Sequence, residues 1–122
     1  MSKQPYIYWS RSDLFWKVRE QAVEYSCCHP DMLYTIRAAA YDERWNPSED
    51  FNGCTFVQDD LHPFLPCFIH DWRWVTRQDT KMADKEFRDN LLHFGYPKWK
   101  ANLYYYTVRI AYLCYYQFKH KL

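Results

Sequence analysis

The stretch PCFIHDWRWVTR, residues 66–77, decides the fold of this chain. Its apolar residues recur at intervals of three and four, which predicts a helix over 66–77. One face of that helix combines apolar and ionisable side chains, namely Cys67, His70, Asp71 and Trp74. Burying an unpaired charge costs several kcal/mol, so Asp71 needs a metal, another cation or hydrogen-bond donors beside it.

The next stretch, TKMADKEFRDNLLHF, predicts a second helix over 80–94 that stops at Gly95. Asp84 lies at the edge of its apolar stripe, which consists of Ala83, Phe87, Leu91 and Phe94. A short turn joins the two helices, so we expect them to be antiparallel neighbours. At ~1.5 Å per residue, His70 and Asp84 then lie within about one turn of the same height. A carboxylate that accepts one imidazole N–H leaves the other nitrogen as a base. The ordinary alternative is a structural His–Asp hydrogen bond, with Asp71 offsetting the helix dipole.

The rest of the chain predicts further helices, so we expect a single all-α domain over residues 1–122. Residues 1–9 resemble an extended arm, and Ser12 or Asp13 can cap the first helix. The predicted helices outside the central pair cover about 13–26, 30–43 and 97–119. Residues 46–66 contain three prolines and several acids, which predicts a long loop. A loop of that length in a small domain is usually functional.

Charge and glycine content exclude several classes of protein. A net charge of +1 lacks the positive field of a general nucleic-acid binder, so we expect no nucleic-acid partner. The only glycines are Gly53 and Gly95. Phosphate-binding loops, dinucleotide fingerprints and nucleophile elbows need clustered glycines, so all three are excluded.

The cysteines and the absence of an export core predict an intracellular protein. The five cysteines are Cys27, Cys28, Cys54, Cys67 and Cys114, an odd number that disfavours a disulfide framework. Charges within residues 1–20 exclude a signal peptide, and no segment is apolar enough to span a membrane. We therefore expect reduced thiols and a cytoplasmic location.

The last predicted helix is rich in aromatic residues. One stripe along it consists of Trp99, Leu103, Tyr106, Ile110 and Leu113, for which core packing is the usual explanation. Further tyrosines occupy its other faces, namely Tyr105, Tyr112, Tyr115 and Tyr116. Tyrosines left on the outside would favour a second copy of the chain, another protein partner or a lipid surface.

Two of these segments resemble the active-site helices of phospholipases A2, particularly the bacterial and parvoviral kinds. Residues 67–74 are similar to their C-x-x-H-D-x-x-Y motif, with Trp74 in place of the tyrosine, and residues 83–87 are similar to A-D-x-x-F. Asn52-Gly53-Cys54 resembles the D-G-C start of a calcium loop. The spacing from His70 to Asp84 is closest to that of small phage-encoded proteins of unknown function, which also have a glycine-proline break and a Val-Arg pair. The counterparts here are Gly95-Tyr96-Pro97 and Val108-Arg109, so the likeness covers residues 52–113.

The resemblance implies a phospholipase A2-like fold and a calcium-dependent phospholipid hydrolase, or an inactive relative. It makes His70 the general base and Asp84 its orienting partner. Calcium would bind Asp71, Asn52 and the Gly53 carbonyl, and these hard oxygen ligands suit that ion. Cys54 and Cys67 match a bacterial disulfide, and Trp74 stands where a tyrosine supports the aspartate. The resemblance also implies a phospholipid membrane as partner, and a location in the cytoplasm of an infected host or in a virion.

Three other interpretations remain open. Cys67 and His70 could form half of a zinc site, completed by Cys27, Cys28, His29 or Cys54. The adjacent His70 and Asp71 also occur in HD-type metal phosphohydrolases, for which His62 and Asp89 would be the further ligands. The third alternative is a non-enzymatic phage virion or host-interaction protein that uses its aromatic last helix.

Overall fold

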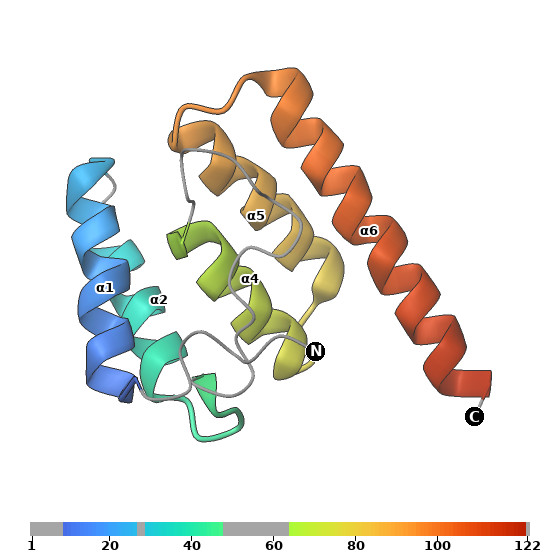
Figure 1. Cartoon of the computed structure of the whole chain (residues 1–122), viewed down its shortest axis with the longest axis horizontal. Coiled ribbons are helices and arrows are strands. Elements are labelled where there is room, and N and C mark those ends of the chain that lie inside the picture. The colour runs from blue at the N-terminus through green and yellow to red at the C-terminus, as the bar shows by residue number, and fades with distance from the viewer. Residues whose placement is uncertain (1–8, 27–28, 48–63, 122) are drawn as a thin grey trace.

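Five α-helices form the described part of the computed structural model, as the sequence predicts for an all-α chain (Figure 1). The structure describes residues 9–26, 29–47 and 64–121, with side chains as far as residue 111. The helices are α1 (Arg11–Glu24), α2 (Pro30–Tyr41), α4 (Phe64–Val75), α5 (Thr80–His93) and α6 (Lys98–Lys121). No helix in these ranges is both long enough and apolar enough to cross a membrane.

Side-chain caps fix where three helices begin. The hydroxyl of Ser10 accepts the Asp13 N–H, and the Asp13 carboxylate accepts the Ser10 N–H, both at 3.0 Å. This reciprocal pair starts α1 at Arg11, so the predicted cap at Ser12 or Asp13 was wrong. Pro30 is the first residue of α2, as predicted, and the Asp79 side chain caps α5.

α4 is the central helix, lying between the α1–α2 pair and α5, with α6 on the outer side of α5 (Figure 1). Helical spacing in the sequence predicts a stripe of Leu14, Val18, Ala22 and Tyr25 along α1. The first three are buried, and Tyr25, at the end of the helix, is partly buried against the core. The predicted stripe of Ala83, Phe87, Leu91 and Phe94 from α5 is buried. Phe68 of α4 is fully buried among them. His70 and Asp71 therefore lie on the helix that contacts three of the other described helices.

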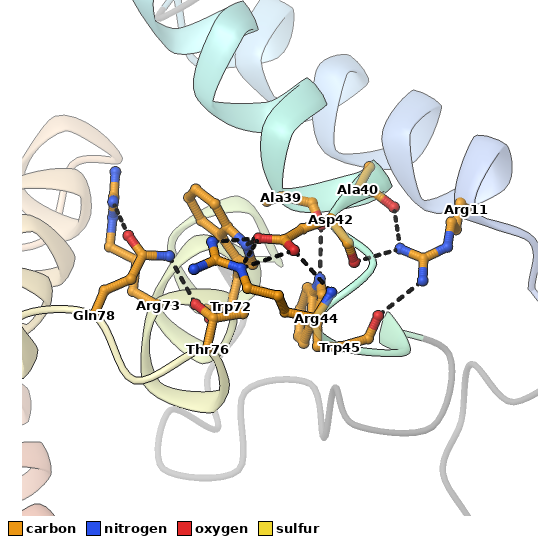
Figure 2. A network of polar contacts seen from close by, with 10 residues as sticks. All are labelled: Arg11, Ala39, Ala40, Asp42, Arg44, Trp45, Trp72, Arg73, Thr76 and Gln78. Atoms are coloured by element: carbon orange, nitrogen blue, oxygen red, sulfur yellow. Dashed lines mark hydrogen bonds and ion pairs between the residues drawn. The ribbon is translucent and has the colours of Figure 1, made fainter.

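Hydrogen bonds at the C-terminal end of α2 tie three helices together (Figure 2). The Arg11 guanidinium of α1 donates to the carbonyls of Ala40, Asp42 and Trp45 at 2.8 to 3.0 Å. The Trp72 indole of α4 donates to the Asp42 carboxylate at 2.8 Å. These donors satisfy groups that a helix end leaves without partners, and they orient α4 against α1 and α2.

Asp42 remains ionised in this cluster. Its strongest interaction is with Arg44, whose guanidinium donates at 2.6 Å. That hydrogen bond holds the pKa of Asp42 far below its usual range, although partial burial acts in the opposite direction. The bond from Trp72 lowers the pKa further. A charged acceptor thus fixes Trp72, which lies two residues from His70.

A buried side chain also caps α4. The Gln21 amide oxygen of α1 accepts the backbone N–H of Leu65 at 2.7 Å, and Gln21 is only 8% exposed. The first turn of α4 has donors without intrahelical partners, and one of them is satisfied here. Both ends of the central helix are therefore tied to the α1–α2 pair.

α6 differs from the sequence prediction. The stripe expected in the core is exposed at all four positions whose side chains are described, namely Trp99, Leu103, Tyr106 and Ile110. The side chain of the fifth member, Leu113, lies outside the described residues. Instead, Ala101 and Val108 face α5 and are 0% and 1% exposed. Core packing was therefore the wrong explanation for this stripe.

Candidate functional site

His70 and Asp84 meet between α4 and α5. Nε2 of His70 lies 2.6 Å from Oδ1 of Asp84, so the imidazole and carboxylate are at the same height, as the helix lengths predict. The His70 side chain is 7% exposed and the Asp84 side chain 0%. The pair is therefore a short, nearly dry hydrogen bond between neighbouring helices.

Three side chains donate hydrogen bonds to the buried Asp84 carboxylate. Oδ1 accepts from His70 and, at 2.9 Å, from the indole N–H of Trp74. Oδ2 accepts from Nη1 of Arg109, also at 2.9 Å. Asp84 lies in the interior rather than at the edge of the stripe, and these donors replace the water that it has lost.

Trp74 supplies an N–H where the phospholipase motif has a tyrosine hydroxyl. Both groups are aromatic donors, and the indole reaches the same carboxylate oxygen that accepts from His70. Trp74 therefore donates a hydrogen bond to Asp84, at the position for which the resemblance implies a tyrosine. It also places a large ring against the imidazole, with the ring centres 5.0 Å apart.

Arg109 completes the cluster, although no role was predicted for it from the sequence. Its guanidinium reaches from α6 across to Asp84, and its side chain is 22% exposed. The Val108-Arg109 pair was part of the motif, and Val108 is buried against α5. The Val-Arg pair was the one feature of the sequence that could have pointed to a role for Arg109. The contact with Asp84 spans 25 residues, however, and depends on how α6 packs.

The other imidazole nitrogen faces Asp71. Nδ1 of His70 is 3.9 Å from Oδ1 of Asp71, which is longer than a hydrogen bond. The side chain of Asp71 is 27% exposed, whereas that of Asp84 is 0% exposed. One nitrogen is thus committed to a buried acceptor, and the second points toward a partly exposed carboxylate.

The surroundings raise the pKa of His70 above its usual 6.5. Burial is the largest single effect and opposes protonation. Asp71 and Asp84 both favour the protonated imidazole, and together they outweigh burial. A raised pKa of this kind is typical of a histidine that accepts a proton during a reaction, and it also occurs in structural ion pairs.

Aromatic rings enclose the imidazole. The ring of Phe87 lies 4.7 Å from it, in addition to the Trp74 ring. These rings fix the orientation of the imidazole and keep bulk water from the Nε2 side. Such packing suits a positioned proton acceptor, because preorganised groups in a water-poor site interact strongly.

The described residues alone do not form a calcium site. Asp71 contributes one carboxylate, whereas calcium takes six to eight oxygen ligands. No three acidic, histidine or cysteine side chains in the described ranges are arranged to hold a metal ion. The other ligands implied by the resemblance, Asn52 and Gly53, lie outside the described residues.

Cys67 forms a disulfide. The expectation of reduced thiols is therefore wrong at this position, because an odd cysteine count does not prevent a single bridge. A disulfide sulfur is not a thiolate, so Cys67 is not the zinc ligand that the C-x-x-H spacing suggests. Cys54, the partner implied by the resemblance, also lies outside the described residues, as do Cys27 and Cys28.

The phosphohydrolase interpretation gains no support from Asp89. Its side chain is 69% exposed and lies 3.9 Å from Arg88, as expected for a residue on the surface of α5. His62, the other ligand of that interpretation, lies outside the described residues.

Comparisons of the chain with protein-family models, with curated proteins and with solved structures gave no match. The function is therefore inferred from the geometry around His70 and from the short motifs that resemble phospholipases A2.

Proposed function

We propose that this protein is an ester hydrolase of the phospholipase A2 type, in which His70 is the general base. The observation that carries the proposal is the 2.6 Å contact between Nε2 of His70 and the buried carboxylate of Asp84. That contact fixes which nitrogen holds the proton, and a general base needs its second nitrogen available for the reaction.

The proposed chemistry begins with neutral His70. Its Nε2–H donates to Asp84, so the lone pair is on Nδ1, the nitrogen that faces Asp71. Nδ1 takes a proton from water while the water oxygen forms a bond to the ester carbonyl carbon. The resulting imidazolium is stabilised by both carboxylates. It then returns the proton to the departing alcohol oxygen as the ester bond breaks, which gives an acid and an alcohol.

Arg109 and Trp74 are positioning residues in this proposal. Each donates to Asp84 at 2.9 Å and restricts the carboxylate to one orientation, which in turn restricts the imidazole. Calcium is proposed as the cofactor, held by Asp71 together with Asn52 and Gly53. When bound, it would supply positive charge for the phosphate and the developing oxyanion.

Hydrolysis of phosphatidylcholine vesicles in the presence of calcium tests the proposal. We expect the wild type to release fatty acid, with His70→Gln slower by about 10²- to 10⁴-fold, the usual contribution of a general base. Chelation of calcium should also abolish the activity. His93→Gln is the matched control, because His93 is an exposed histidine on α5. Equal rates for the wild type and His70→Gln would show that His70 is not the base.

A second candidate function is a non-enzymatic interaction protein, such as a phage virion or host-interaction component. The exposed apolar stripe on α6 favours it, because such surfaces mark interaction sites. In that case no fatty acid is released, and the His70–Asp84 pair contributes only to stability.

A further inference from the structure

α6 exposes four large apolar side chains along one line. The exposed fractions are 68% for Trp99, 53% for Leu103, 60% for Tyr106 and 61% for Ile110. We name these four residues the outer stripe. Isolated exposed apolar residues are ordinary, but a continuous row of four is typical of an interaction surface.

The outer stripe lies opposite the face of α6 that packs on α5. Ala101 and Val108 form that inner face and are buried. At 100° per residue, the outer stripe is centred about half a turn from them. Figure 1 shows α6 as the outermost helix, with no other labelled helix on its far side. α6 is thus apolar on two opposite faces, and one of them has no partner among the described helices.

We infer that a second copy of the chain packs antiparallel on the outer stripe. The stripe residues are spaced by four, three and four, a mean of about 3.7 residues, so they form one line along α6 that a partner helix can follow. A second copy offers the same row of apolar side chains, so the two rows can cover each other along their length. The inference does not depend on the proposed hydrolase activity.

Side-chain sizes favour the antiparallel orientation. A two-fold axis between Leu103 and Tyr106 places Trp99 opposite Ile110 of the partner subunit. It also places Leu103 opposite the partner's Tyr106. Each layer then combines a large ring with an aliphatic side chain, which fills space evenly. A parallel pair would instead oppose Trp99 to the partner's Trp99 and Tyr106 to the partner's Tyr106.

Charge also favours this orientation. The sequence of α6 contains no acidic residue, and its lysines are at both ends, Lys98 and Lys100 at the start and Lys119 and Lys121 at the end. A parallel pair would bring the four ammonium groups of Lys98 and Lys100 to the same end. The antiparallel pair separates them by the rise from Trp99 to Ile110, about 16 Å at ~1.5 Å per residue. That distance exceeds the screening length of about 8 Å in physiological salt.

The area of the outer stripe predicts a weak dimer. The exposed parts of two aromatic and two aliphatic side chains offer roughly 500 Å² per copy. A pair would bury about 1,000 Å², the lower limit for a specific interface. We therefore expect a dissociation constant in the micromolar range.

Sedimentation equilibrium of the full chain, from about 5 to about 500 µM, tests the inference around this affinity. We expect the wild-type mass to rise from one chain to two. Tyr106→Glu should weaken association at least about tenfold, because it buries a charge in the seam. Tyr34→Glu is the matched control, because Tyr34 is a 77% exposed tyrosine on α2, and this variant should associate like the wild type. Circular dichroism checks that both variants are folded.

Compensating charges test the orientation. Leu103→Lys and Tyr106→Glu should each weaken the dimer, and the double variant should recover at least part of the lost affinity. In the antiparallel pair each new lysine faces a glutamate of the partner, whereas a parallel pair opposes like charges. Loss of affinity beyond that of both single variants would exclude the antiparallel arrangement.

Other results would overturn the inference altogether. These are a wild type that is monomeric at every concentration, or a dimer that Tyr106→Glu and Tyr34→Glu affect equally. If the monomer binds vesicles of anionic lipid through the outer stripe, the surface belongs to a membrane instead. A monomeric wild type would overturn the dimer but not the hydrolase proposal, because the hydrolysis assay tests His70 independently. The two proposals can therefore fail separately.

Discussion

At the scale of single residues, Asp84 determines how the centre of the molecule is organised. It is fully buried, and donors from α4 and α6 converge on its two oxygens. Removing one partner of such a cluster leaves the others buried without hydrogen bonds. The imidazole of His70 therefore has one well-defined orientation, with Nε2 on Asp84 and Nδ1 toward Asp71.

The raised pKa of His70 predicts how stability depends on pH. The folded protein binds the His70 proton more tightly than the unfolded chain does. Its contribution to stability is therefore fully present below about pH 6.5, the usual pKa, and is lost as the pH rises through the folded-state pKa. We expect the urea midpoint of the wild type to fall over this range relative to that of His70→Gln.

The control for this experiment is His93→Gln, which should retain the pH dependence of the wild type. An identical pH dependence in the wild type and His70→Gln would contradict the assigned shift. Hydrolysis should change in the opposite direction, since a general base works only when deprotonated. The pH range in which His70 is most active is thus the range in which it stabilises the fold least.

At the scale of elements, the end of α4 contains a backbone conformation that glycine would favour. Arg77 has a φ of +58°, and the N–H groups of Arg77 and Gln78 close the helix on Trp74 and Arg73. This is the left-handed position of a Schellman motif, which costs a residue with a Cβ about 1 kcal/mol. Arg77 is exposed.

We expect Arg77→Gly to stabilise the protein by about 0.5–1 kcal/mol, measured by urea unfolding. Arg77→Ala is the control, because it removes the same side chain but keeps the Cβ. If the two variants have equal stability, the backbone at this turn is not strained.

Helix periodicity predicted where the helices are better than it predicted which face of each helix is buried. The spacing of Leu14, Val18, Ala22 and Tyr25 identified the inward face of α1, since the first three are buried and Tyr25 is partly buried. The same reasoning was wrong for Trp99 and Leu103, because α6 has two apolar sides and periodicity does not say which one meets the core. At the start of α1, several candidate caps follow one another, and only tertiary structure selects among them.

The site was predictable to the extent that it is local. His70 and Asp84 lie on consecutive helices joined by a short turn, so counting residues from the turn gave their relative height. Arg109 was not predictable in this way, since it belongs to another helix and reaches Asp84 across 25 residues. The hydrogen bond from the Trp74 indole to Asp84 could not be predicted either, because a sequence motif does not specify the orientation of a side chain.

At the scale of the whole molecule, α6 packs on fewer of the described helices than α4 does. α4 contacts α1, α2 and α5, whereas α5 is the main neighbour of α6. Helices with few buried contacts open at lower free energy than the global unfolding reaction. Arg109 adds an ion pair between α6 and the buried Asp84 of α5.

We therefore expect amide hydrogens in residues 98–111 to exchange faster than those of α4, and Arg109→Gln to accelerate them further. The substitution removes the charged contact to Asp84, so protection should fall mainly in α6 while α1 and α2 keep theirs. Native-state hydrogen exchange measured by mass spectrometry gives this comparison by segment, and work at low protein concentration avoids protection by a second copy. A uniform loss of protection across all helices would mean that Arg109 supports global stability instead. In that case α6 is part of the same cooperative unit as the His70 site, and Asp84 couples them.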